Sequence, residues 1–401
     1  TLIPKLHIIF EQCGIKKGDH IAICAKSSAE WCVAFLAIAS YEAVAVPLLS
    51  DFLPENILNL TKASDSKLLF VDKSVLAGMQ RDYLVDKFAG IDKFVALVDI
   101  VTCKAVEGYE SGYNVNSETV DKIHEERYPC GMSADDVELN NGNINNLSVI
   151  SYTSGTSSSP KGVMLPARSL SGNIEIARKL VPIAVKEGGN TLSILPFAHI
   201  FGLSFDFLFL FSCGCHINIF TEKPVPARLL KALSAVKPFI FLTVPLLVEK
   251  VFRSKVIPTL RKPVMKFLLS IPGVRRLILN KVRSKIIDTF GGNLAKAGFF
   301  IGGAAISKDV DKVMKKILKY IFVGICGAAL AACIVIAFTA GVSSRKSLRC
   351  TGLQVTILDS SRNTFVSRKD VKGYLDKEYG KYIGDVIDSI DLVKVEKIVD
   401  G

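Results

Sequence analysis

The sequence predicts an α/β protein that is built from layered, largely parallel sheets. Short apolar runs at residues 20–24, 43–49 and 67–71 indicate buried strands, and the segment between the first two has helical character. Strands of a parallel sheet are apolar along their whole length, because helices cover both faces. Strands that alternate with helices in this way are typical of α/β layers.

Further elements follow in the same alternating order. Residues 1–20 predict a helix that ends in a turn, and Ser27 with Glu30 has the spacing of a capping box at the start of the next helix. Residues 103–146 are polar and predict a surface excursion before a buried strand at 147–152. The later elements are a helix over 167–182, a strand from Leu192, a strand in 236–245 that ends in a turn, and a strand from Phe299.

A loop of small polar residues follows the strand at 147–152. It runs Tyr152-Thr-Ser-Gly-Thr-Ser-Ser-Ser-Pro-Lys161-Gly162. Backbone N–H groups and hydroxyls of such a loop can surround phosphate oxygens, and Lys161 adds a compact positive charge. The order of the Walker motif is absent. The alternative is a solvated Ser/Gly turn, but the position between two apolar runs favours a phosphate-binding loop.

A second motif, Leu195-Pro-Phe-Ala-His199-Ile-Phe-Gly202, puts a single histidine on a short loop after a strand. Taken alone, a structural histidine is the commoner interpretation. The apolar run 203–211 that follows predicts either the lining of an acyl pocket or ordinary core packing, and both interpretations stay open.

These stretches closely resemble two signatures of the adenylate-forming enzymes, which include acyl-CoA synthetases, luciferases and peptide-synthetase adenylation domains. The family pattern Thr-Ser-Gly-Thr-Thr-Gly-x-Pro-Lys-Gly matches residues 153–162 except at Ser157 and Ser158. Glycine in place of Ser158 would permit a positive φ. The Leu-Pro-x-x-His-x-x-Gly signature matches residues 195–202. The resemblance is to long-chain fatty acid–CoA ligases, and it predicts an adenylating large domain over residues 1–310.

The resemblance implies ATP-dependent conversion of a long-chain fatty acid to acyl-AMP and then to acyl-CoA, with ATP, Mg²⁺ and CoA as substrates and cofactors. The residues that it assigns to the ATP phosphates are Thr153, Ser154, Gly155, Thr156, Ser157 and Lys161, with Thr156 also at the metal. Those that it assigns to the acyl pocket are His199, Phe201 and Gly202, and those on the adenine side are Gly302, Gly303 and Ala304.

The family pattern stops after about Asp309. The Gly-Tyr-Gly-x-Thr-Glu loop, the ribose aspartate, the hinge arginine and the catalytic lysine that the family carries further on are not found in the sequence. No catalytic set is therefore complete. We expect the adenylating domain to be truncated and the chain to be a poor or inactive catalyst.

The run Ile321–Ala340 contains no charged residue. Twenty helical residues span about 30 Å, which is the hydrocarbon thickness of a bilayer. A transmembrane helix is predicted over 320–341, and a buried core helix is the alternative. The surrounding lysines and arginines favour a single-pass membrane protein with a cytoplasmic N-terminal part.

Residues 350–401 predict a partial α+β segment that resembles a POTRA module. From Met314 onward, the chain resembles the N-terminus of an FtsQ/DivIB-type cell-division protein. Two alternatives to a synthetase follow. One is a membrane-anchored division protein with division-protein partners that carries a synthetase segment, and the other is an artefactual join of two partial proteins.

The charge and composition of the chain indicate which kinds of partner it could bind. The net charge is +12 and 49% of residues are hydrophobic. No zinc-finger, RNP or basic-zipper pattern accompanies the charge, so a membrane surface is favoured over nucleic acid. Residues 255–289 carry many lysines and arginines among leucines and isoleucines. This helical region predicts contact with a membrane surface or an anionic ligand such as CoA, and a solvated helix face is the alternative.

Overall fold

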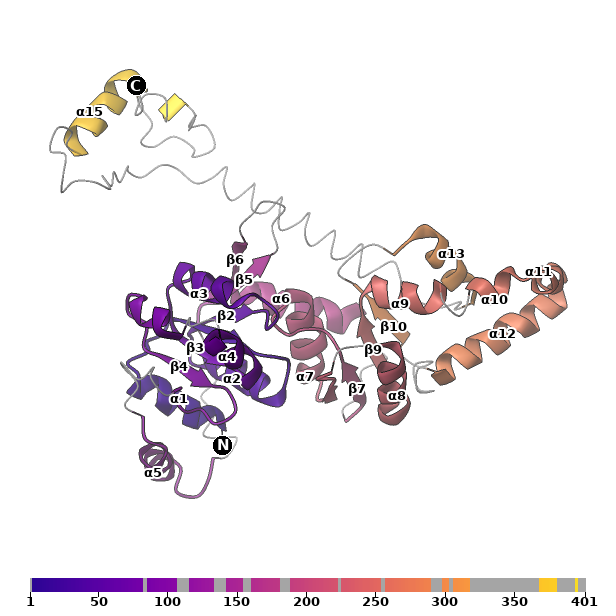
Figure 1. Cartoon of the computed structure of the whole chain (residues 1–401), viewed down its shortest axis with the longest axis horizontal. Coiled ribbons are helices and arrows are strands. Elements are labelled where there is room, and N and C mark those ends of the chain that lie inside the picture. The colour runs from indigo at the N-terminus through magenta and orange to yellow at the C-terminus, as the bar shows by residue number, and fades with distance from the viewer. Residues whose placement is uncertain are drawn as a thin grey trace. The chain divides into compact units, whose positions relative to one another are not determined.

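The computed structural model divides the chain into two compact units, residues 1–323 and 324–401, which are taken separately (Figure 1). The residues that the structure describes are 2–81, 85–106, 115–132, 142–153, 160–180, 188–222, 225–253, 257–289, 298–302, 306–317, 368–380 and 394–395.

The first unit contains a six-stranded sheet of order β4-β3-β1-β2-β5-β6. All neighbours are parallel except β5 and β6, which form an antiparallel pair. The strands are β1 (His20–Cys24), β2 (Val44–Leu48), β3 (Ser66–Val71), β4 (Ala96–Asp99), β5 (Leu147–Thr153) and β6 (Lys161–Pro166). The predicted α/β fold with largely parallel sheets is therefore confirmed.

Helices accompany this sheet: α1 (Leu2–Gln12), α2 (Ala29–Ser40), α3 (Pro54–Ala63), α4 (Lys73–Arg81), the 3₁₀ helix η1 (Val85–Gly90), α5 (Ser117–Arg127) and α6 (Ala167–Leu180). Alternate residues of β1 enter two different cores. Ile21 and Ile23 join one hydrophobic cluster, and Ala22 and Cys24 join the other. Because both faces are buried, the four residues from Ile21 to Cys24 are all apolar, and only His20 at the start of the strand is polar.

A second sheet has four parallel strands in the order β10-β9-β7-β8. They are β7 (Asn190–Ser193), β8 (His216–Ile219), β9 (Ile240–Thr243) and β10 (Gly298–Ile301). The helices of this part are η3 (Gly202–Phe209), α7 (Leu210–Ser212), α8 (Pro226–Val236), α9 (Pro245–Val251), α10 (Ile257–Arg261), α11 (Pro263–Ser270), α12 (Pro272–Thr289) and α13 (Lys308–Ile317). Leu192, Phe241 and Val310 lie in the core beneath these helices.

Two local predictions were wrong, and one element was not predicted. The cap of α2 is Ser28, whose hydroxyl accepts the N–H of Trp31, so Ser27 is not the capping residue. The polar excursion 103–146 was not expected to contain a helix, but it includes α5, whose N-cap is Asn116. The turn expected after β9 is the first turn of α9, and proline is favoured in such a turn because its missing N–H would have no helical partner there.

The second unit contains helix α15 (Arg368–Glu378), close to the helix predicted after Ser367. No helix among the described residues is long and apolar enough to cross a membrane. The predicted span 321–340 lies outside those residues, as does most of the predicted POTRA-like segment, so both remain predictions.

Candidate functional site

The base of the predicted phosphate loop is the antiparallel pair β5–β6. Thr153 ends β5 and Lys161 begins β6, and the two residues are direct partners in the ladder. The Thr153 hydroxyl donates to the Lys161 carbonyl at 3.5 Å, and both residues are exposed. A hydroxyl and an ammonium group therefore lie at one end of the sheet. The loop residues Ser154, Gly155, Thr156 and Ser157 lie outside the described residues.

Position 162, which is a glycine, leaves little room for a side chain, because β6 passes close over side chains of β5. A Cβ atom on Gly162 would lie 3.1 Å from Ile150 Cγ2 and 3.2 Å from the Tyr152 ring. These distances are tighter than ordinary van der Waals contact. The Lys-Gly step of the motif therefore lets β6 pair closely with β5.

The histidine loop begins where β7 ends, and a buried carboxylate holds its first residues. Asp206 Oδ2 accepts the Ser193 hydroxyl at 2.6 Å and the N–H groups of Leu195 at 3.1 Å and Ile194 at 3.2 Å. Burial raises the pKa of the Asp206 carboxyl to about 7, although these three donors act to lower it. No described residue lies within hydrogen-bonding distance of its second oxygen.

Ser27 holds the same loop from the side of the first sheet. Its hydroxyl accepts the N–H of Phe197 at 2.9 Å and lies 3.4 Å from the Leu195 carbonyl. The Phe197 N–H and the Leu195 carbonyl belong to the residues on either side of Pro196, which has no N–H of its own. The buried Phe197 ring packs 5.6 Å from the Trp31 ring. The loop is thus fixed to both sheets of the unit.

His199 is exposed at the far end of this loop. Its backbone N–H donates to the Pro196 carbonyl at 3.0 Å, and its Nδ1 accepts the N–H of Phe201 at 3.4 Å. In a neutral imidazole this arrangement leaves the proton on Nε2. His199 can therefore present one N–H donor to a ligand.

The predicted acyl-side and adenine-side residues meet directly. A Cβ atom on Gly302 would lie 2.2 Å from Phe201 Cζ, so the aromatic ring occupies the space that a larger residue would need. The Gly302 N–H donates to the Thr243 carbonyl at the end of β9. Gly303 and Ala304, which follow in the predicted adenine turn, lie outside the described residues.

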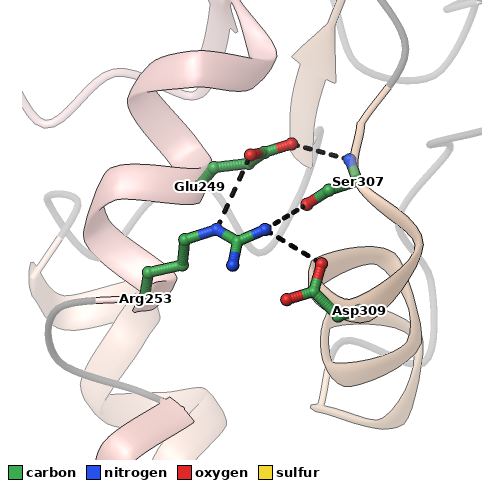
Figure 2. A network of polar contacts seen from close by, with 4 residues as sticks. All are labelled: Glu249, Arg253, Ser307 and Asp309. Carbon is green, nitrogen blue, oxygen red and sulfur yellow. Dashed lines mark hydrogen bonds and ion pairs between the residues drawn. The ribbon is translucent and has the colours of Figure 1, made fainter.

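A polar network fixes the chain just beyond that turn (Figure 2). Glu249 on α9 accepts the N–H of Ser307 at 2.6 Å. The Arg253 guanidinium donates to the Ser307 hydroxyl at 3.1 Å and to Asp309 at 3.0 Å, and its Nε lies 3.8 Å from the second Glu249 oxygen. Gly302 and Ser307, the described residues on either side of the predicted turn, are therefore each held by a hydrogen bond from their N–H group.

The apolar run after His199 contributes mainly to the core. Leu203 and Phe207 lie in the large hydrophobic cluster of the first sheet, and Phe209 is also buried. These side chains favour the core interpretation over an acyl lining. The run forms the π-helix η3, a rare form that occurs often at functional sites. Among the described residues there is no group of His, Cys, Asp and Glu side chains that could hold a metal ion.

Sequence reasoning missed the residues that hold the motifs in place: Ser27, Asp206, Glu249 and Arg253. The sequence could have indicated Asp206, because it is the single charged residue in the apolar run Leu203–Phe211. A buried charge requires partners, so an acid in such a run indicates a hydrogen-bonded site. Glu249 and Arg253 have only the i, i+4 spacing of an ordinary helix pair.

Comparison with known proteins agrees with this geometry. The long-chain-fatty-acid–CoA ligase 5 of Rattus norvegicus is 31% identical over 286 residues, which cover 69% of this chain and 40% of the rat protein. The chloroplastic long-chain-fatty-acid–[acyl-carrier-protein] ligase AEE15 of Arabidopsis thaliana is 28% identical over 242 residues, which cover 60% of this chain and 32% of that ligase. This chain thus spans well under half the length of these curated relatives.

Solved structures share the fold. A red-emitting luciferase from Phrixothrix hirtus superposes with a TM-score of 0.56 at 18% identity, over 79% of this chain and 52% of the luciferase. ATP-bound MatB from Rhodopseudomonas palustris superposes with a TM-score of 0.53 at 18% identity, over 78% of this chain and 50% of MatB. The model of the family described as AMP-binding enzyme matches residues 8–375. The chain therefore belongs to the AMP-binding enzyme family.

Proposed function

We propose that this chain binds ATP through the loop from Thr153 to Lys161 and activates a long-chain fatty acid as its acyl adenylate. The observation that carries the proposal is the pairing of Thr153 with Lys161, which sets a hydroxyl and an ammonium group at the two ends of a Ser/Gly loop. Identity to long-chain fatty acid ligases supports the substrate class.

In the first step, a carboxylate oxygen attacks the α-phosphorus of ATP. The bond from that phosphorus to the bridging oxygen breaks, and pyrophosphate leaves with the bonding electrons. This chemistry needs neutralised charge on the phosphates more than proton transfer. Lys161 would supply one positive charge and the loop N–H groups would supply further donors. Mg²⁺, when bound, would neutralise additional phosphate charge. In the second step, the CoA sulfur bonds to the acyl carbon, its thiol proton is released, and AMP leaves.

The acyl group would lie against the histidine loop. His199 is exposed and has an N–H available, and the Phe201 ring of the same loop contacts Gly302. Its ring would therefore lie between the acyl and adenine sides. We infer that Phe201 is a wall shared by both substrates.

Binding and turnover are separable in this proposal. The sequence does not contain the Gly-Tyr-Gly-x-Thr-Glu loop that the family uses around the nucleotide. We therefore expect the chain to bind ATP and to turn palmitate over weakly.

Calorimetric ATP titration of the wild type, Lys161→Ala and Lys231→Ala tests the proposal. Lys231 is an exposed lysine on α8 and serves as the matched control. Loss of one charged phosphate contact should weaken ATP binding by at least about tenfold in Lys161→Ala, because hydrogen bonds to charged groups contribute about 1.5–3 kcal/mol. Equal ATP affinity in all three proteins would refute the phosphate-loop assignment. Rapid ATP–pyrophosphate exchange with palmitate would refute the expected weak turnover.

We also propose that residues 321–340 anchor the chain in a membrane, with the preceding part cytoplasmic. The support is their length without charge and the flanking lysines and arginines. Extraction of cell membranes with alkaline carbonate tests the anchor, since a spanning segment stays with the lipid. Release of the whole chain into the supernatant would exclude it. The division-protein alternative would require localisation to the division site.

A further inference from the structure

Helix α11 exposes its apolar side chains instead of burying them. Val264 is 71% exposed, Phe267 is 69% exposed, and Ile271, directly after the helix, is 39% exposed. Their spacing of three and four residues puts all three on one side of the helix. The helix packs against α10 and α12 (Figure 1). These contacts leave the stripe uncovered in the described part of the chain.

Helix α12 also exposes an apolar side chain near its start. Leu277 is 70% exposed, while Leu279 and Val282 pack on the core of the second sheet. The helix therefore has an inner apolar side that stabilises the fold and an outer leucine that does not. Large apolar side chains exposed together on a monomer are uncommon unless they bind something.

Basic residues surround these apolar side chains. Arg261 and Lys262 precede α11, and Arg275 and Arg276 lie near the start of α12, all of them exposed. The sequence from Ile257 to Thr289 contains eight lysine or arginine residues and one aspartate, Asp288. Exposed apolar side chains within such a charge excess are the pattern of helices that lie in a membrane interface.

We propose that α11 and the start of α12 form a peripheral docking surface for an anionic lipid bilayer. Val264, Phe267, Ile271 and Leu277 would enter the boundary between headgroups and acyl chains, and the neighbouring arginines and lysines would contact anionic headgroups. A polyanion such as nucleic acid would satisfy the charges but would leave the apolar stripe in water. An uncharged apolar partner would leave the basic residues without counter-ions. A bilayer with anionic lipids satisfies both.

The test needs a local signal, because residues 321–340 could hold the chain on vesicles by themselves. The only tryptophan, Trp31, is fully buried. A Phe267→Trp variant of the full chain therefore adds a reporter on α11, and the wild-type signal can be subtracted. Leu53→Trp is the matched control, since Leu53 is 69% exposed between Asp51 and Glu55. The probes are vesicles of phosphatidylcholine and equimolar phosphatidylcholine–phosphatidylglycerol vesicles, each with and without brominated chains.

We expect the Phe267→Trp emission to move to shorter wavelength and to be quenched by brominated lipid in the mixed vesicles. The Leu53→Trp emission should not respond. Each lysine or arginine near an anionic surface strengthens partitioning about fivefold. Adding Arg275→Glu and Arg276→Glu to the reporter should therefore weaken the partitioning of this surface, read as bromine quenching at position 267, by well over tenfold. Lys62→Glu with Lys73→Glu, at exposed positions of α3 and α4, should not weaken it. Added salt should act in the same direction as the arginine changes.

Three results would overturn the proposal. Equal quenching at positions 267 and 53 would mean that no specific face meets the lipid. Quenching that ignores salt and the arginine changes would exclude an electrostatic surface. A concentration-dependent shift of the Phe267→Trp emission without vesicles would mean that a second copy of the chain covers the stripe. None of these readings depends on ATP binding, so the docking surface and the proposed function can fail separately.

Discussion

The ring of Phe201 lies directly on Gly302, so the loop that carries His199 and the residue that follows β10 are in contact. The ring is nearly buried and packs 5.2 Å from the Phe205 ring. A methyl group at position 302 would displace it, since the added Cβ would lie 2.2 Å from Cζ. These two segments come from different signatures of the sequence, and the structure joins them through one side chain.

We predict that Gly302→Ala destabilises the protein through Phe201 alone. Forcing a buried ring from its position costs about 1–3 kcal/mol. The same substitution in a Phe201→Ala background should cost much less, because the obstacle is gone. Urea denaturation of the double-mutant cycle measures this coupling. Gly172→Ala, at an open position of α6, is the control. Equal costs of Gly302→Ala in both backgrounds would contradict the contact.

Gly202→Ala should lower the free energy of unfolding more than Gly302→Ala does. A Cβ atom on Gly202 would lie 2.2 Å from the carbonyl oxygen of Pro196. A backbone atom cannot turn away as a ring can, so the histidine loop itself must move. We expect a loss of about 3 kcal/mol or more in the free energy of unfolding, together with faster amide exchange at Phe197. A stable Gly202→Ala protein with unchanged exchange would show that the loop tolerates the methyl group.

The sequence predicted the sheets and the motifs, but not how the motifs are held. Strand β1 was predicted at its observed bounds because burial on both faces requires apolar side chains, and Ile21 to Cys24 form such a run after His20. Ser27 was predicted as a helix cap, although the neighbouring Ser28 serves that role and frees the Ser27 hydroxyl for the loop. Two adjacent serines satisfy the same local rule. Only the contact of Ser27 with Phe197, 170 residues further along the chain, shows which serine caps the helix and which holds the loop.

Glu249 should contribute more than Arg253 to the stability of the segment that begins at Ser307. Arg253 contacts exposed partners, where ion pairs are screened by water, whereas Glu249 accepts a partly buried N–H. Removal of the carboxylate in Glu249→Ala leaves the Ser307 N–H without its acceptor, at a cost of about 1–3 kcal/mol. Chemical denaturation should therefore give Glu249→Ala the lowest free energy of unfolding of the three variants. Glu249→Gln should be intermediate, and Arg253→Ala should have the highest value.

Arg228→Ala, which removes one exposed ion pair with Glu222, is the control for this ranking. Its effect should be small and similar to that of Arg253→Ala. If Arg253→Ala lowered the free energy of unfolding more than the other variants, the Arg253 guanidinium, and not the Glu249 carboxylate, would make the main stabilising contacts of the network.

Asp206 should make the stability of the protein fall as the pH rises from about 4 to about 7. Burial raises the pKa of its carboxyl to about 7 in the folded protein, whereas an unfolded aspartate titrates near 3.9. Between these values the folded state holds a proton that the unfolded state has lost. Stability from this group is therefore greatest below the unfolded pKa, decreases through the window, and is constant above it.

The whole change amounts to at most about 4 kcal/mol, because each pKa unit corresponds to about 1.4 kcal/mol. Asp206→Asn removes the titration, so its unfolding free energy should lack this decrease between pH 4 and pH 7. Asp92→Asn, at an exposed turn, should keep the wild-type slope. Guanidinium denaturation at several pH values gives the slopes directly. If wild type and Asp206→Asn had parallel pH profiles, the carboxyl would remain ionised in the fold, and its three donors would outweigh the cost of burial.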